Sequence, residues 1–302
     1  MRRIQFFAPT IKHFEIESYK NSGEPVFIPV SITGSSCALS CKHCNKKLLE
    51  TMTPATTPER LYKIAEGLAS KGSYGMLVSG GADRNGVVPL GKFAPVLRRI
   101  KEEFGLNVAV HTGIVTKELA AALSESKIHS AMLDIIGDND TIREIYGLNA
   151  VVEDYEKSLE NVIGVGVPAA PHIVIGLHFG QVRGEYRAVD IAAKYPLASL
   201  VLVAFKPISG TEMASSEVAS PEEIRDVIIY ARSKMPETKI LLGCARPGGE
   251  HQILTDRYAI EAGVDGIAYP SEEAVGIARE KGFEISFSEV CCSLIFDNPP
   301  VR

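Results

Sequence analysis

No apolar run in the 302-residue chain approaches the roughly 18 residues that a membrane-spanning helix requires. A signal-peptide core is also absent, because acidic and polar residues interrupt the N-terminal stretch MRRIQFFAPTIKHFEIESYK before an apolar segment can form. Positive charge is not in excess: the net charge is -5 and the isoelectric point is near 5.9, which disfavours nucleic acid as a partner. We therefore expect a cytoplasmic protein without a membrane partner, whose thiols are free for metals or catalysis.

Eight short β-rich segments alternate with helical patterns, and their middles are continuously apolar, as in parallel strands that helices cover on both faces. The segments span residues 25–33, 75–80, 107–113, 129–137, 169–177, 197–207, 239–247 and 264–270. This order predicts one large α/β domain, a (β/α)8 barrel of TIM type, complete or partial. The alternative is an open sheet of six strands plus an extension. The predicted parts are an N-terminal extension at 1–24, the barrel at 25–283, and a C-terminal tail over the barrel mouth at 284–302.

Several helix ends can be read from the sequence. Thr57 followed by Pro58 predicts an N-cap with proline at the first helical position. The segment 220–223, Ser-Pro-Glu-Glu, predicts the same arrangement with a capping-box glutamate. A final helix is expected over 271–281, and Gly282 stands where it should end.

Three of the six cysteines, Cys37, Cys41 and Cys44, have the spacing C-x3-C-x2-C, and no fourth cysteine follows nearby. They come shortly after the first barrel strand, and the working face of such barrels lies at the carboxyl ends of the strands. Structural zinc usually has four protein ligands, whereas three cysteines can hold a [4Fe-4S] cluster with one iron open. We predict such a cluster. The alternative is zinc completed by His43 or a remote cysteine, which the position of His43 between two ligands on a tight loop disfavours.

This spacing, on the loop after the first barrel strand, resembles that of the radical S-adenosylmethionine (SAM) superfamily. The resemblance implies that the open iron binds the amino and carboxylate groups of SAM. It also implies that an electron, from a donor such as ferredoxin or flavodoxin, splits SAM into methionine and a 5'-deoxyadenosyl radical. Cys37, Cys41 and Cys44 would then be the catalytic centre as well as the metal ligands.

The resemblance extends to residues expected to bind SAM. His43 precedes the last cysteine, where the family usually has an aromatic residue near the adenine. The SAM ammonium is expected at the turn formed by Gly80, Gly81, Ala82 and Asp83. Asp83 stands where the family has glutamate, and a Gly-Gly pair is also common in an ordinary tight turn. Asp134 matches a polar group near the ribose, although it also fits a helix N-terminus.

Other residues are expected at the barrel mouth. Val174 and Gly176 keep part of the family pattern on the fifth strand, and Val174 is expected near the adenine. The remaining candidates are His111, His172, His178, Arg183, Lys206 and Arg246. For Arg246 we expect hydrogen bonds to cluster sulfides or to the SAM carboxylate. Each histidine also fits a core or capping role.

The other three cysteines suggest a second iron-sulfur cluster. Cys244 ends the seventh predicted strand, and Cys291 and Cys292 lie in the tail beside Ser293, a conceivable non-thiolate ligand. A tail across the mouth would bring these groups above the cavity of the first cluster. The alternative is that they are small buried apolar residues, because adjacent cysteines cannot both bind one cluster without backbone distortion.

Several long stretches resemble one component of the two-protein, archaeal-type lipoyl synthases. They include SGGADRNGVVPL, LDIIGDNDTIREIYGL, GCARPGGEH and the cysteine-serine tail. The resemblance implies sulfur insertion into an octanoyl chain on a lipoyl-carrier protein or peptide, with a second radical SAM subunit as partner and the second cluster as sulfur donor. Two alternatives stay open. One is another biotin synthase-like radical SAM enzyme, such as a methylase or hydrogenase-cofactor maturase; the other is a non-catalytic Fe-S or zinc protein.

Overall fold

The structure, a computed structural model, describes residues 2–295 and contains all eight predicted barrel strands. Each strand lies inside its predicted segment, because a continuous apolar run between turn residues suits a strand that is buried on both faces. They are β4 (Phe27–Ser31), β6 (Gly75–Ser79), β7 (Asn107–His111), β8 (Ser130–Met132), β9 (His172–Ile175), β10 (Leu200–Ala204), β11 (Ile240–Leu242) and β12 (Gly266–Ala268). The (β/α)8 fold class is therefore confirmed.

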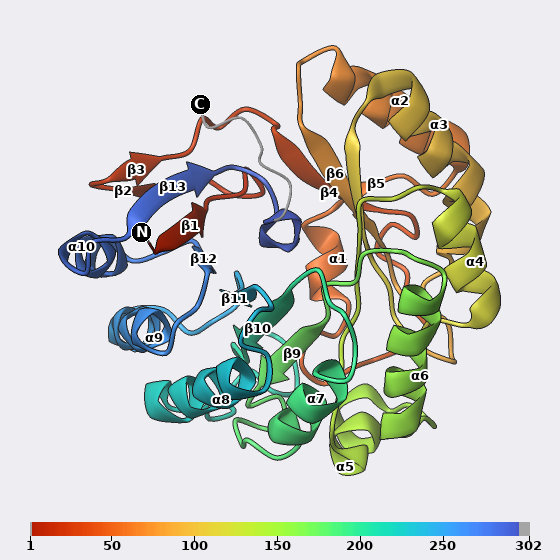
Figure 1. The fold of residues 1–302 in the computed structure, drawn as a ribbon. Helices are drawn as coiled ribbons and strands as arrows, with labels where there is room; N and C mark the ends of the chain where they lie inside the picture. Colours follow the sequence, from red (N-terminus) through yellow and green to blue (C-terminus); the bar gives the residue numbers. More distant parts are fainter. Residues whose placement is uncertain (1, 296–302) are drawn as a thin grey trace.

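The barrel strands form one curved arc of parallel strands (Figure 1). One sheet has the order β5-β4-β6-β7-β8, where β5 is Thr53–Pro54. The other contains β12-β11-β10-β9, and isolated parallel bridges between Ala131 and Ala169 and between Asp134 and His172 connect β8 to β9. Within the described residues no ladder joins the two free ends of the arc, so the barrel is partial.

Two strands that the sequence did not reveal extend the arc. β1 (Arg3–Phe7) lies between β12 and β13 (Glu284–Ser288), and it pairs in parallel with both. The predicted N-terminal extension and tail therefore each add a strand to the sheet. A short hairpin, β2 (Glu15–Ile16) and β3 (Tyr19–Lys20), follows β1.

The tail departs from its predicted place over the mouth. Its short helix η3 (Cys292–Leu294) contacts both β8 and β12, which lie on different sides of the arc, so η3 lies inside the barrel. Val290 and Leu294 are buried there against Phe27. The physical reason is that the open seam leaves apolar strand faces uncovered, and the apolar tail residues fill that space. Residues 296–302 of the predicted tail lie outside the described part.

Helices cover the outer face of the arc (Figure 1). Besides η3, the helices of the described chain are α1 (Lys47–Glu50), α2 (Pro58–Ala69), η1 (Leu90–Phe93), α3 (Ala94–Phe104), α4 (Lys117–Glu125), α5 (Asn139–Thr141), η2 (Ile142–Tyr146), α6 (Val152–Gly164), α7 (Glu185–Ala192), α8 (Pro221–Lys234), α9 (Glu250–Glu261) and α10 (Glu272–Glu280). Of these, α1 lies inside the arc in Figure 1, and η2 contacts the loop that follows β4. The predicted caps are present: the Thr57 hydroxyl accepts from the Arg60 amide at 3.2 Å, and Ser220 and Glu223 form a capping box. Gly282 has a φ of 71° just after α10.

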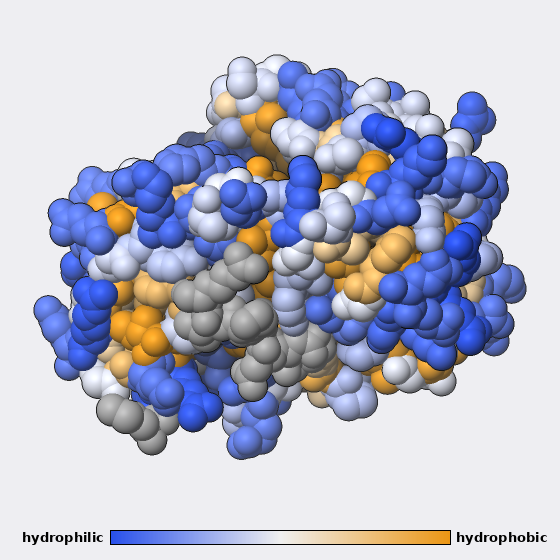
Figure 2. Space-filling view, turned by 90° about the horizontal axis from the view of Figure 1, so that it is seen from above, coloured by the Kyte–Doolittle hydropathy of each residue, from blue (hydrophilic) through white to orange (hydrophobic). Residues whose placement is uncertain are grey.

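The mixture of polar and apolar residues on the surface agrees with the composition of the chain. Figure 2 shows that hydrophilic side chains dominate one face, with smaller hydrophobic patches between them. Among the described helices, none has the length and apolar character needed to cross a bilayer.

Candidate active site

The cysteine loop after β4 lies at the mouth of the barrel, beside a cavity of about 310 Å³. Cys37, Cys41 and Cys44 all line this cavity, together with the turn after β6. The loop is fixed by main-chain contacts: the Ala38 amide donates to the Ala82 carbonyl at 2.8 Å, and the Lys42 amide donates to the Ile145 carbonyl at 2.9 Å. The chain thus brings the three predicted ligands to one cavity that is large enough for a small-molecule ligand.

The turn after β6 supports the cysteine loop directly. A Cβ atom at Gly81 would lie 2.1 Å from the Ser36 carbonyl oxygen and 2.5 Å from the Cys37 Cβ atom, so only glycine fits. The Gly81 amide donates to the Thr33 hydroxyl at 2.7 Å. Asp83 accepts from the amides of Asn85 and Val87 at 2.8 and 3.0 Å, so its carboxylate closes its own loop. Gly80, Gly81 and Ala82 line the cavity, whereas Asp83 does not.

The three thiols differ in their surroundings. A hydrogen bond from the Cys41 thiol, aided by His43, lowers the pKa of Cys44 to about 4. The hydrogen bond to Cys44, together with burial, raises the pKa of Cys41. The Cys37 and Cys41 sulfurs lie 3.7 and 3.9 Å from the carbonyl oxygens of Ala82 and Tyr146. Three thiols that line one cavity, with Gly81 packed against their loop, fit a [4Fe-4S] cluster in which one iron has no protein ligand.

His43 lies closer to its neighbours than the sequence suggested. Its ring nitrogen and the sulfurs of Cys41 and Cys44 lie within 4.8 Å of one another, which corrects the expectation that His43 could not approach a shared metal. The reason is the tight turn, in which Asn45 and Lys46 both have positive φ. The His43 ring also packs against Tyr146, with centroids 5.1 Å apart. Cys37 is outside this compact group, and three ligands do not complete structural zinc.

Asp134 faces the cavity and connects several side chains inside the barrel. Its carboxylate accepts from the Tyr146 hydroxyl at 3.3 Å and lies 3.7 Å from His111 Nε2. His111 and His172 have ring centroids 5.4 Å apart, and burial together with His111 lowers the pKa of His172 to about 4. The alternative N-cap role belongs to Asp138 instead, whose carboxylate accepts from the Thr141 amide at 2.9 Å.

Tyr146 is a site residue that the sequence analysis missed. It ends η2, a π-helical turn, and its ring, hydroxyl and carbonyl contact His43, Asp134 and Cys41 respectively. The only sequence signal is an aromatic residue before Gly147, which has a φ of 64°. π-helical turns are frequent at functional sites.

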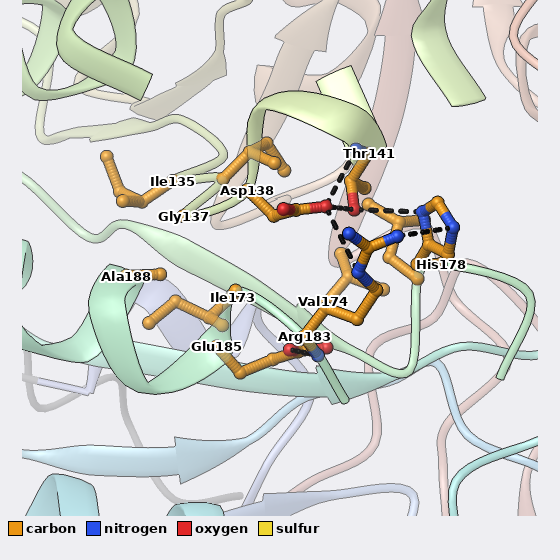
Figure 3. A pocket seen from close by; sticks show the side chains of 13 residues that line it. Ile135, Gly137, Asp138, Thr141, Ile173, Val174, His178, Arg183, Glu185 and Ala188 are labelled. Atoms are coloured by element: carbon orange, nitrogen blue, oxygen red, sulfur yellow. Dashed lines mark hydrogen bonds and ion pairs between the residues drawn. The ribbon is translucent and has the colours of Figure 1, made fainter. Parts of the chain in front are cut away.

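His178 and Arg183 line the pocket of Figure 3 and not the cavity of the cysteine loop. Thr141 Oγ1 lies 3.1 Å from His178 Nδ1, and an Arg183 guanidinium nitrogen lies 3.0 Å from His178 Nε2. Because arginine can only donate, His178 accepts at Nε2 and donates from Nδ1 to Thr141. The Arg183 guanidinium also lies 3.6 Å from Asp138. This network fills a pocket of about 20 Å³, room for about one water, and holds two loops together.

Val174 and Gly176 do not reach the cavity of the cysteine loop. Val174 lines the pocket of Figure 3 and packs against the interior cluster that contains Cys292. Gly176 has a φ of 76°, and its amide donates to Glu185 at 2.8 Å, so it serves a turn. Among the described residues Val174 is not part of the lining of the cysteine-loop cavity, so its expected adenine contact stays a prediction.

Arg246 has a structural role. Its guanidinium lies 2.8 Å from Asp256, and both side chains are almost fully buried. It also donates to the carbonyls of Gly243 and Ala268 at 3.0 and 2.7 Å. The expected bond to cluster or SAM is wrong, because these partners occupy the guanidinium. Lys206 is exposed at the end of β10.

The remaining cysteines come together inside the barrel. Cys244 follows β11, its side chain is accessible, and desolvation together with the nearby Cys291 raises its pKa. Cys291 lies 4.0 Å from Met132, and the Ser293 hydroxyl donates to the Cys291 sulfur at 3.2 Å. Hydrogen bonds from Cys292 and Ser293 lower the pKa of Cys291 to about 7. The hydrogen bond with Cys291 and burial raise the pKa of Cys292, and the charges of Cys291 and Cys244 add to this effect.

Known proteins resemble the chain in sequence and in fold. Biotin synthase from Geobacter metallireducens is 26% identical over 249 residues, covering 80% of this chain and 73% of that protein. Biotin synthase from Geotalea daltonii is 27% identical over 247 residues, covering 78% and 71%. Among solved structures, the FeFe-hydrogenase maturase HydG from Carboxydothermus hydrogenoformans has a TM-score of 0.64 at 18% identity, covering 94% of this chain and 68% of that one.

Methylornithine synthase (PylB) has a TM-score of 0.61 at 13% identity, covering 98% and 86%. These structures share the fold. Residues 31–189 match the radical SAM superfamily, which implies a [4Fe-4S] cluster and SAM as cofactors. The match contains the cysteine triplet, the turn after β6 and Asp134. The chain therefore belongs to the radical SAM superfamily, and the biotin synthases are among the proteins it resembles.

Proposed function

We propose that this protein inserts sulfur into an octanoyl chain carried by a lipoyl-carrier protein or peptide, as one component of a two-protein lipoyl synthase. Cys37, Cys41 and Cys44 would hold the [4Fe-4S] cluster, which together with SAM would supply a 5'-deoxyadenosyl radical able to remove hydrogen from an unactivated C–H bond. An alkyl C–H bond has no acidic proton and no leaving group, so acid-base catalysis alone cannot activate it. A second radical SAM subunit and an electron donor such as ferredoxin or flavodoxin are the partners in this proposal.

The single observation that carries the proposal is the position of the tail thiols relative to the first site. Met132 and Asp134 are two residues apart at the end of β8, so their side chains share the inner face. Met132 contacts Cys291, and Asp134 lines the cavity of the cysteine loop. Cys244, Cys291 and Cys292, with Ser293, are thus candidate ligands for a second, sulfur-supplying cluster a short distance from the SAM site.

The chain's own residues would hold the alkyl chain and exclude water. Apolar side chains line the cavity of the cysteine loop, among them Leu39, Leu77 and Val88. An apolar wall offers no charge to orient an octanoyl chain, so shape and position determine which hydrogen is reached. The same wall keeps solvent from a reactive carbon centre.

The test is anaerobic reconstitution followed by iron, sulfide and product analysis. We expect about eight irons per chain for two cubanes. The triple variant Cys244→Ala/Cys291→Ala/Cys292→Ala should lose about four of them and still cleave SAM reductively. Mass spectrometry of an octanoylated carrier should show added sulfur with the wild type and none with this variant.

Full iron content in the triple variant would refute the second cluster and with it the sulfur-insertion proposal. Two clusters without sulfur transfer would indicate a different biotin synthase-like reaction. The matched control is Cys41→Ala, which removes a ligand of the first site and should abolish SAM cleavage while the tail thiols stay intact.

A further inference from the structure

Four lysines around the barrel mouth have no carboxylate partner, although the protein as a whole is acidic. Lys12, Lys42, Lys47 and Lys206 form no ion pair with any described carboxylate, and neither does Lys46, which lines the cavity. Ion pairs such as Arg98–Glu102 and Lys194–Glu156 lie on the outer helices, where unpaired lysines such as Lys63 and Lys71 also occur. The four lysines at the mouth are set apart by lying around one opening. We call these four residues the lysine crescent. Unpaired positive charge in one place on a chain of net charge -5 produces a local field of opposite sign.

Contacts place the lysine crescent along one side of the mouth. Lys42 Nζ lies 5.5 Å from the centroid of the Phe179 ring, in the loop after β9. Lys47 passes Gly210, in the loop after β10, where a Cβ atom would lie 3.1 Å from its Nζ. These two lysines therefore extend from the cysteine loop across to the loops that follow β9 and β10.

The other two lysines continue the crescent. Lys206 follows β10, and Lys12 Nζ lies 4.0 Å from the centroid of the Tyr269 ring, after β12. Lys12 and Lys206 are close enough for Lys206 to contribute to the lowered pKa of Lys12, after the larger effect of burial. The crescent thus follows the loops after β9 to β12, above the thiols of the tail.

An apolar feature accompanies the charge. Leu48 is 54% exposed, next to Lys47, and it lines the cavity of the cysteine loop. Most exposed leucines occur singly and need no explanation, but this one stands where a chain entering the cavity would pass. A cationic rim with an apolar entrance matches a partner that offers acidic side chains around an alkyl group.

We propose that the lysine crescent is the docking surface for an acidic carrier protein that presents its acyl chain on a lysine arm. This inference rests on the proposed function and adds the surface that the carrier recognises. Acidic groups around the modified lysine contact the crescent, while the arm and its alkyl chain pass Leu48 into the barrel. Charge complementarity of this kind mainly raises the association rate and sets partner choice, and salt weakens it.

The test compares two octanoylated substrates: the intact carrier protein and a short, uncharged octanoyl-lysine peptide. For Lys47→Glu/Lys206→Glu, the ratio of kcat/KM for carrier to kcat/KM for peptide should fall about tenfold or more at low ionic strength. High salt should also lower the ratio of kcat/KM for carrier to kcat/KM for peptide in the wild-type protein. The matched control is Lys63→Glu/Lys71→Glu, which makes the same change of charge on exposed lysines of α2 and its following loop, and it should keep the wild-type ratio.

Direct binding of the octanoylated carrier separates the two proposals. Wild-type protein that binds the carrier in a salt-dependent way but modifies neither substrate would refute the proposed function and retain the docking surface. An unchanged ratio in the crescent variant, or an equal loss in the control variant, would overturn the docking surface. So would absence of carrier binding, or tighter binding to vesicles of anionic lipid than to the carrier.

Discussion

At Gly81, a methyl group would fall 2.1 Å from the Ser36 carbonyl oxygen and 2.5 Å from the Cys37 Cβ atom. These neighbours are main chain or the root of a side chain, so Gly81→Ala must move the cysteine loop or the turn after β6. We expect the free energy of unfolding to fall by about 1–3 kcal/mol, as for other overpacked sites. Iron bound on anaerobic reconstitution should fall as well, because Cys37 moves with the loop.

Gly67→Ala is the control for this change. Gly67 lies on the exposed side of α2 and a Cβ atom there meets no other atom within 4 Å, so alanine should stabilise the helix by about 0.5–1 kcal/mol. Urea unfolding of the metal-free proteins measures both effects. Gly81→Ala protein with wild-type stability and iron content would contradict the close packing seen here.

Individual residues show which parts of the site could be predicted from the sequence and which could not. The cysteine triplet was predictable because its spacing is local and chemically specific. Arg246 was not, because its partner Asp256 lies in α9 and no periodic pattern connects a strand-end arginine to that helix face. The position of Asp134 at the end of a strand was predicted from the sequence. Its hydrogen bond with Tyr146 was not, because that contact depends on how η2 packs over the cysteine loop.

At the scale of elements, η2 joins the cysteine loop to Asp134. Its last two carbonyls contact the Lys42 amide and the Cys41 sulfur, and the Tyr146 hydroxyl donates to Asp134. Tyr146→Phe removes only the last contact. If Asp134 lies near the SAM ribose, as the family resemblance implies, we expect about tenfold weaker SAM binding, since a hydrogen bond to a charged group contributes about 1.5–3 kcal/mol. Iron content should not change, because the main-chain contacts remain.

Tyr230→Phe is the matched control, because its hydroxyl also donates to an aspartate, Asp190, at 2.8 Å, but on the outer helices. SAM affinity, followed through the change it causes in the spectrum of the reduced cluster, should be unaffected in this variant. Equal weakening in both variants would show that lost stability, not the position of Asp134, is responsible.

The strands differ in how well the sequence predicted them. The buried strands β4 and β6 to β12 were found because a continuous apolar run signals burial on both faces. β1 and β13 were missed because each is one short segment whose partner is remote: Arg3 pairs with Glu284. Their strand character comes from this long-range pairing, which local periodicity does not contain.

At the scale of the whole molecule, the tail completes the barrel interior. Leu294 is fully buried and packs with Phe27, Ala109 and Met132 from three different parts of the arc. Leu294→Ala should lower the free energy of unfolding by about 2–5 kcal/mol, the range for buried leucine. The control variant Ile229→Ala truncates an apolar side chain that is 49% exposed, and it should change the free energy of unfolding by less than about 0.5 kcal/mol. Denaturant unfolding of both proteins measures the difference, and a small effect at Leu294 would mean that the tail does not support the core.

The parallel pairing of β1 with β12 and β13 has a consequence for biosynthesis. After β1 has been translated, about 260 further residues must follow before β12 exists and about 280 before β13 exists, a wait of roughly 15–60 s at usual elongation rates. Only then can η3 pack between β8 and β12 and bring the tail thiols beside Cys244. Loading of any second cofactor that uses the tail thiols therefore comes after the tail has been made, and a chaperone or loading factor acting before then would meet a chain whose interior is still open.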